Sequence, residues 1–137
     1  MKRRYVIQAH SAKRAGLHYD FRVEWDGELK TYHKKRPSSN EPHGTPAPTV
    51  LRSWCIPKAR LPWFNEKLLA IPVEDHPIEY ISFEGTIEDG YGAGEVKIVA
   101  SGECYVRTDR GTVTVELKRG TYKLIPFKKN YLITRVG

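Results

Sequence analysis

The segment Leu17–Trp25, LHYDFRVEW, alternates apolar and polar residues without a break. Successive side chains of a β-strand point to opposite faces, so this alternation predicts a strand with one apolar face and one polar face. The inward set is expected to be Leu17, Tyr19, Phe21, Val23 and Trp25, and the outward set His18, Asp20, Arg22 and Glu24.

Similar strand-like runs, separated by turn residues, extend to the end of the chain. Further strands are expected at 4–8, 28–34, 50–58, 95–100, 103–108, 112–117, 121–127 and 131–136, with a short helical turn within 60–80. Regular short strands of this kind are typical of a sandwich or a closed barrel. We favour a compact, mainly antiparallel all-β barrel, because closure removes the exposed edges that so many strands would leave.

Two connections have distinct signals. Asp26-Gly27 stands between two alternating runs and predicts a hairpin turn that pairs 17–25 with 28–34. The segment 36–49, RPSSNEPHGTPAPT, carries four prolines and almost no large apolar residue, so it predicts an exposed Pro-rich loop.

The composition indicates a folded protein with an affinity for polyanions. The 137 residues are 39% hydrophobic and carry 23 Lys plus Arg against 16 Asp plus Glu, a net charge of +7. This length suits a single domain, 1–137, and this charge favours nucleic acid or an anionic surface. The two cysteines, Cys55 and Cys104, are expected to be buried free thiols. No apolar run has the length of a membrane span or a signal peptide, so we expect a cytoplasmic protein that does not associate with membranes.

The polar set of 17–25 has chemistry that an ordinary solvated strand lacks. His18 and Asp20 lie two residues apart on one face, about 6.6 Å along the strand, and the two side chains can converge on one metal ion. Arg22 follows on the same face, where its planar guanidinium can grip two oxygens of a phosphate. His10 is the nearest third ligand if SAKRAGL folds back as a loop. Taken alone, the pattern is equally that of a solvated strand face.

A second constellation is VEDHPIEY, 73–80. Pro77 restricts His76 to an extended backbone and fixes the imidazole at one position of a loop, although a simple turn would give the same pattern. The Gly-rich stretch 83–96 lacks the Gly-Lys-Ser/Thr ending of a phosphate loop and predicts tight turns. His33 and His43 are expected to be solvated.

Together, VIQAH, LHYDFRVEWDGELK, SWCIPK, VEDHPIEY, FEG and YGAGEV, in this order, resemble the 3′-phosphoesterase domain of bacterial DNA ligase D and its stand-alone archaeal relatives. The resemblance covers roughly residues 5–100. It implies a compact β-barrel that trims 3′ ends before ligation with a divalent metal, typically Mn²⁺, with Zn²⁺ or Co²⁺ as alternatives. The implied partners are 3′ ends of primer-template DNA or DNA/RNA and a separate DNA ligase.

Carried over position by position, the resemblance implies roles for individual residues. His10, His18 and Asp20 would bind the metal, and Arg22 and His76 would hold the scissile phosphate. Tyr80 would join that pocket and Gln8 would support its floor, while Glu24 and Lys58 would have supporting tasks. Only nine residues precede His10, which makes removal of a 3′-phosphate the expected main step and removal of a terminal ribonucleoside the second.

Two other functions remain open from the residues alone. A non-haem iron oxygenase would bind its metal through His18, Asp20 and His76 and leave His10 free. A non-catalytic nucleic-acid-binding barrel would grip a strand with its basic surface and exposed aromatic side chains, and would need no metal.

Overall fold

A computed structural model describes residues 2–26, 29, 49–90 and 92–137. The predicted hairpin strand 28–34 and the predicted loop 36–49 therefore lie outside the described residues, apart from Leu29 and Thr49. His33 and His43 also lie outside them.

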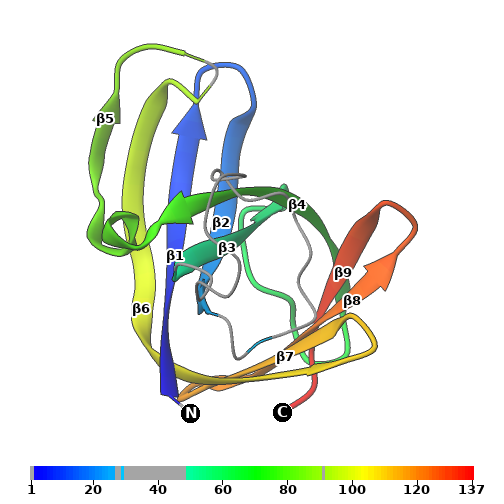
Figure 1. Cartoon of the computed structure of the whole chain (residues 1–137). Coiled ribbons are helices and arrows are strands. Elements are labelled where there is room, and N and C mark those ends of the chain that lie inside the picture. Colours follow the sequence, from blue (N-terminus) through cyan, green and yellow to red (C-terminus); the bar gives the residue numbers. More distant parts are fainter. Residues whose placement is uncertain (1, 27–28, 30–48, 91) are drawn as a thin grey trace.

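Within the described residues, the chain forms strands throughout, with one short 3-10 helix (Figure 1). The elements are β1 Lys2–Ala12, β2 Gly16–Trp25, β3 Val50–Ile56, β4 Lys67–Pro77, η1 Ile78–Ser82, β5 Gly85–Ile87, β6 Gly94–Asp109, β7 Thr112–Leu117, β8 Gly120–Phe127 and β9 Asn130–Arg135.

The strands form a closed antiparallel ring, which confirms the predicted all-β barrel. The strand order is β1-β2-β3-β4-β9-β8-β7-β6-β5, and an additional pairing of β1 with β6 closes the ring. β5 pairs only with the first residues of β6 and lies outside this closure. Closure leaves the ring strands with neighbours on both sides, which satisfies their backbone hydrogen-bonding groups.

One sequence prediction about strands was wrong. The runs 95–100 and 103–108 are one strand, because β1 pairs with β6 from Gly94 to Tyr105 and carries it through Ser101-Gly102. The pairing predicted between 17–25 and 28–34 falls on residues outside the described part of the chain. Both edges of β2 are taken, one by β1 and the other by β3.

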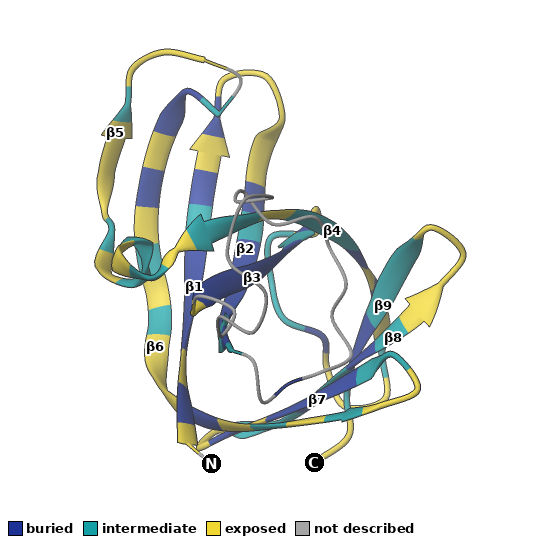
Figure 2. Cartoon of the chain, in the orientation of Figure 1, coloured by how far each residue is buried: buried dark blue, intermediate teal, exposed yellow. Residues whose placement is uncertain are grey.

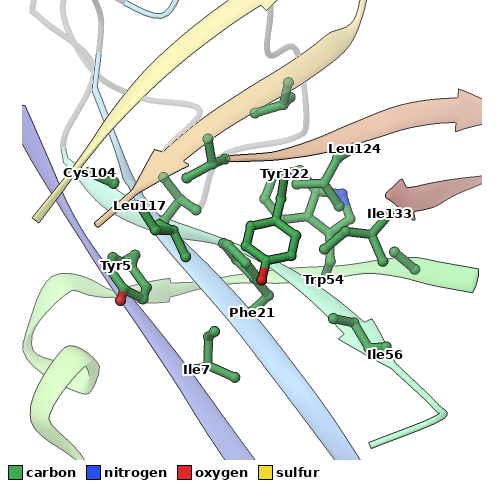
Figure 3. Packing of buried hydrophobic residues seen from close by; sticks show 14 of the residues in the cluster. Tyr5, Ile7, Phe21, Trp54, Ile56, Cys104, Leu117, Tyr122, Leu124 and Ile133 are labelled. Carbon is green, nitrogen blue, oxygen red and sulfur yellow. The ribbon is translucent and has the colours of Figure 1, made fainter. Parts of the chain in front are cut away.

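Buried positions recur along the ring strands (Figure 2), and their hydrophobic side chains pack into one core cluster, part of which is seen in Figure 3. Phe21, Val23 and Trp25 of β2 are fully buried in it, as the alternation predicted. Leu17 is 57% exposed instead of buried, and Tyr19 is only partly buried. The pairing of β2 with β3 begins at Tyr19, so Leu17 lies before the part of β2 that has β3 beside it.

The two cysteines are free thiols, as predicted; Cys104 is buried and Cys55 partly buried. Among the residues that the structure describes, no helix has the length and apolar character needed to cross a bilayer.

Candidate functional site

The polar face of β2 points away from the core, yet it is buried instead of solvated. His18 is 8% exposed, Asp20 5% and Arg22 4%. Side chains of β1, the end of β4 and η1 enclose them, which the sequence did not indicate. Glu24, farther along the same face, is half-buried and pairs with Arg4 at 3.2 Å, so it ties β2 to β1.

Antiparallel pairing of β1 with β2 brings the three predicted metal ligands together. His10 lies directly opposite His18 in the register, and their ring centroids are 4.8 Å apart. Asp20 Oδ2 lies 3.5 Å from His10 Nδ1 and 3.3 Å from His18 Nε2. The chain turns back from β1 into β2 through a tight hairpin instead of the expected loop, because β1 continues to Ala12 and β2 begins at Gly16.

Backbone carbonyls fix the orientation of both imidazoles. His10 Nε2 lies 2.7 Å from the carbonyl oxygen of Gly92, and His18 Nδ1 lies 3.2 Å from that of Gly16. A carbonyl can only accept, so each of these nitrogens carries the proton and donates. The other nitrogen of each ring faces Asp20, and with a metal ion bound it would present its lone pair to the ion, which is how histidine ligands are commonly oriented in metal sites.

The charges in this cluster also suit a cation. Burial disfavours the ionised form of Asp20, but hydrogen bonding to His18 and the nearby charge of Arg22 outweigh it and lower the pKa of this carboxyl. The hydrogen bond to Asp20 raises the pKa of His18. The nearest donor atoms of His10, His18 and Asp20 all lie within 4.8 Å of one another, so these three residues could hold a metal ion.

Arg22 lies beside this cluster and is held on several sides. Its Nε donates to Gln8 Oε1 at 2.7 Å, and its Nη1 donates to Ser53 Oγ at 2.9 Å. Its Nη2 lies 3.4 Å from Asp20 Oδ2. The ring of Tyr80 packs over the guanidinium, with the ring centroid 4.9 Å from Cζ. The guanidinium is therefore fixed in position before any ligand arrives.

Gln8 connects this arginine to the 3-10 helix. It is fully buried, and its Nε2 donates to the carbonyl oxygens of Tyr80 at 3.3 Å and of Phe83 at 3.1 Å. One amide therefore fixes both the guanidinium and the backbone that carries Tyr80.

His76 completes the same side of the site. Its Nδ1 lies 3.1 Å from Arg22 Nη1 and 3.1 Å from the carbonyl oxygen of Glu74. Nδ1 lies between a group that only donates, Arg22 Nη1, and one that only accepts, the Glu74 carbonyl. In the neutral ring with the proton on Nε2, Nδ1 accepts from Arg22, whereas in the protonated ring it would donate to Glu74. Burial and the neighbouring charge of Arg22 lower the pKa of His76. Burial raises the pKa of Tyr80, which keeps its phenol protonated.

These groups line one pocket of about 480 Å³. Its lining includes six of the predicted site residues, His10, His18, Asp20, Arg22, His76 and Tyr80. Gln8 is not part of the pocket lining, but it accepts a hydrogen bond from Arg22, which is. Lys58 is exposed in the turn after β3 and is not part of the pocket lining.

Sequence reasoning missed several supporting groups. Ser53 holds Arg22 because the β2–β3 register places the two residues opposite each other, and that register cannot be deduced from the motif SWCIPK. The carbonyls of Gly16 and Gly92 leave no signal in side-chain patterns. Cys55 lies opposite Asp20, but burial raises the pKa of its thiol to about 11, so it is not an activated nucleophile.

The arrangement separates two of the functions left open. The group of three that could hold a metal contains His10, whereas His76 is hydrogen-bonded to Arg22. An oxygenase that binds its metal through His18, Asp20 and His76 would need the opposite assignment. The site instead combines a metal-ligand cluster with a fixed cation in one pocket, which suits a phosphate ester.

Comparison with known proteins agrees with this geometry. Residues 8–129 match the family model of the DNA ligase D 3′-phosphoesterase domain. A multifunctional non-homologous end joining protein LigD from Pseudomonas aeruginosa is 43% identical over 94 residues, 68% of this chain and 8% of that protein. The Mycobacterium tuberculosis LigD is 42% identical over 99 residues, 72% of this chain and 10% of that protein.

A third relative extends the match along the chain. The LigD of Mycolicibacterium smegmatis is 38% identical over 115 residues, 83% of this chain and 12% of that protein. The chain thus spans roughly a tenth of the length of these curated relatives. The residues that match the family model, 8–129, include all those that line the pocket. The chain therefore belongs to the DNA ligase D 3′-phosphoesterase domain family.

Proposed function

We propose that this protein is a divalent-metal-dependent phosphoesterase that heals 3′ ends of nucleic acid. It removes a 3′-phosphate from a primer strand and leaves a 3′-hydroxyl, and in a diesterase step it removes a 3′-terminal ribonucleoside. The observation that carries the proposal is the pocket itself, in which His10, His18 and Asp20 face a fixed Arg22 and His76.

The donor set fits a divalent cation of the first transition row. Two neutral imidazoles and one carboxylate leave coordination positions open for water and for a phosphoryl oxygen. A bound Mn²⁺, with Zn²⁺ or Co²⁺ as alternatives, would be held by His10, His18 and Asp20 and would act as a Lewis acid on the phosphate.

Arg22 binds and orients the phosphate. The guanidinium is already held by Gln8 and Ser53, so little conformational entropy is lost when a phosphate arrives. Its charge offsets the negative charge on the phosphoryl oxygens, which spreads as the bond to the leaving oxygen breaks. Burial strengthens this interaction because little water screens it.

His76 donates to the phosphate or to the leaving oxygen. In the neutral ring, its Nε2–H is free of the contacts that hold Nδ1. An arriving dianionic phosphate opposes the effect of Arg22 and raises the pKa of His76, which favours a protonated imidazole in the complex. In the hydrolysis, water adds to phosphorus and its second proton passes to a phosphate oxygen, while the bond from phosphorus to O3′ breaks and O3′ takes a proton from His76 to leave as a hydroxyl. The products are the 3′-hydroxyl and dihydrogen phosphate, and His76 regains its proton from solvent.

Tyr80 shapes this side of the pocket. Its ring lies against both the guanidinium of Arg22 and the ring of His76, whose centroid is 4.8 Å away. It limits the movement of both groups and provides a phenol that can donate to a phosphate oxygen.

The proposed substrates are 3′ ends of primer-template DNA or DNA/RNA, and the proposed partner is a separate DNA ligase. The support is the name of the relatives, which are multifunctional non-homologous end joining proteins. A ligase needs the 3′-hydroxyl that this reaction produces, so the two activities would act in sequence in DNA repair.

The test is release of phosphate from a 3′-phosphate primer-template with and without Mn²⁺, with the 3′-hydroxyl scored by polymerase extension. His10→Ala should lose both metal binding and turnover. His76→Ala should keep metal binding, measured by calorimetry, and lose turnover. Loss of metal binding in His76→Ala, with retention in His10→Ala, would instead support the oxygenase. Metal-independent binding of the strand without turnover would indicate a barrel that only binds nucleic acid.

A further inference from the structure

Five residues form a transverse row on the outer surface of the ring, on strands β6, β7, β8, β9 and β4. The register pairs Arg107 with Thr114, Thr114 with Lys123, Lys123 with Thr134, and Thr134 with Lys67. Paired residues of neighbouring strands point to the same face. The alternate residues of these strands, among them Val113, Val115, Leu124 and Ile133, are in the core, so the row faces outward.

The row alternates cations with threonines, and because Thr114 and Thr134 are only 7% and 5% exposed, the cations form its accessible part. Strands lie about 4.8 Å apart, so its three cations recur about every 9.6 Å over about 19 Å. A stacked nucleic-acid strand advances about 3.4 Å per nucleotide along its axis, so a strand that keeps this stacked spacing along the row would meet a cation at about every third phosphate. Within the described part of the chain, Lys67 and Lys123 have no acidic group at salt-bridge distance.

The C-terminal strands of the row carry an excess of positive charge. Residues 101–137 hold eight Lys or Arg and three Asp or Glu, a net charge of +5. Residues 74–95, which include η1 and β5 beside the pocket, hold seven Asp or Glu and no Lys or Arg. β7, β8 and β9 lie on the side of the ring away from β5 and η1 (Figure 1). A polyanion is therefore drawn to the strands of the row and repelled from the flank of the pocket.

A hollow of about 370 Å³ opens at one end of the row, between Arg107, Thr114 and Lys123. Thr108, Thr112 and Asp109 complete its lining. Three hydroxyls and two cations suit a phosphate oxygen, while the carboxylate of Asp109 opposes an anion. Arg107 also contacts Glu116 at 3.4 Å, but this pair is exposed at 70% and 46%, and such pairs contribute little. Arg107 can exchange Glu116 for a phosphate.

Exposed aromatic rings stand at both ends of the row. Tyr105 is 47% exposed and lies two residues before Arg107, on the same face of β6. Trp63 and Phe64 are 66% and 63% exposed and shortly precede Lys67, with Phe64 bridged to Arg135 of β9. Bases of a single strand stack on such rings, whereas the bases of a duplex are not available for stacking.

We propose that this outer surface is a binding site for single-stranded nucleic acid, with Arg107, Lys123 and Lys67 on the phosphates and Trp63 and Tyr105 under the bases. The inference deepens the proposed function, because it rests on nucleic acid being the substrate and adds a second contact surface remote from the pocket. That surface would hold an unpaired strand, such as a template overhang, while the pocket acts on the 3′ end.

The test measures binding without catalysis. A fluorescent oligodeoxythymidylate of about 12 nucleotides with a 3′-hydroxyl is titrated in a buffer with chelator, between about 50 and 200 mM salt. The triple variant Arg107→Gln/Lys123→Gln/Lys67→Gln should lower affinity by about tenfold or more at low salt. It should also lower the slope of log affinity against log salt by about 2, since each single-strand phosphate contact contributes about 0.7.

The matched control removes the same charge outside the row. Lys118→Gln/Lys128→Gln/Lys129→Gln changes exposed hairpin residues and should change the slope by less than half as much. Asp109→Asn should strengthen binding by about two- to fivefold, a gain that misfolding cannot produce. Trp25 and Trp54 are fully buried, so binding should quench the emission of Trp63.

The outcomes separate this site from the proposed activity. An equal loss of oligonucleotide affinity in the row and control variants would refute the proposed binding surface. So would the absence of oligonucleotide binding by an unaltered protein that still releases phosphate. Either result would leave the proposed phosphoesterase activity standing. Row-dependent binding without phosphate release would refute the phosphoesterase and leave the surface intact. The row variant should release phosphate from a 3′-mononucleotide at the unaltered rate.

Discussion

Replacement of Gln8 by Met tests whether a buried amide positions the phosphate-binding arginine. Gln8 is fully buried, accepts from Arg22 Nε at 2.7 Å and donates to the carbonyls of Tyr80 and Phe83. Met has a similar length and makes none of these hydrogen bonds. The change therefore removes three contacts with little change in packing volume.

The expected loss of stability follows from those contacts. A hydrogen bond to a charged group contributes about 1.5–3 kcal/mol and a neutral one about 0.5–1.5 kcal/mol. One bond to the guanidinium and two to carbonyls together give a loss of about 2.5 kcal/mol or more in the free energy of unfolding. Urea denaturation of the two proteins measures this difference directly.

The same change should affect catalysis separately from folding. Without Gln8, Arg22 keeps its bond to Ser53 but loses its Nε anchor, and Tyr80 loses the support of its backbone. A displaced phosphate-binding group can cost about 100-fold in rate, so we expect a decrease of about 10- to 100-fold in kcat for phosphate release. Mn²⁺ affinity should not change, because Gln8 is not a ligand.

Ser53→Ala is the matched control. It removes one neutral acceptor from Arg22 Nη1 and leaves Gln8 in place, so its effects on stability and kcat should be smaller. The reasoning fails if Gln8→Met folds with unchanged kcat, or if it loses Mn²⁺ affinity in parallel with activity.

Four further outcomes are expected. Leu124→Ala should lower the free energy of unfolding by about 2–5 kcal/mol in urea denaturation, because this side chain is fully buried in the core. Hydrogen bonds from Arg60 lower the pKa of Glu66 from 4.5 to about 2; the ionised form therefore stabilises the fold above pH 4.5, and this contribution declines as pH falls toward 2. A carboxyl NMR titration should find that low pKa and its return toward 4.5 in Arg60→Met. The Cys55 thiol, with a pKa of about 11, should react with a disulfide reagent at pH 8 far more slowly in the native than in the unfolded protein, and Cys55→Ala should keep activity. Mn²⁺ should raise Tm in the unaltered protein and leave the Tm of His18→Ala unchanged, because a ligand stabilises only a fold that binds it.

The sequence predicted the site residues better than their surroundings. Motif resemblance and strand period together selected six of the residues that line the pocket, including His10, eight positions before His18. The alternation of apolar and polar residues could not show that His18 and Asp20 are buried, because their burial depends on β4 and η1, which are distant in sequence. Nor could it show Ser53 as a partner of Arg22, because strand register is set by the closure of the ring.

The alternation of LHYDFRVEW by itself determined that one face of this strand packs in a core while the other gathers an imidazole, a carboxylate and a guanidinium. This follows because neighbouring side chains of an extended backbone must point to opposite sides. Tertiary structure alone decided which residues of other strands meet them. The pairing of β1 with β2 sets His10 against His18, the turn of the chain after β4 lays Tyr80 over Arg22, and the same ring closure aligns Arg107, Lys123 and Lys67 on the outer surface. Such contacts depend on long-range register, which local periodicity does not encode.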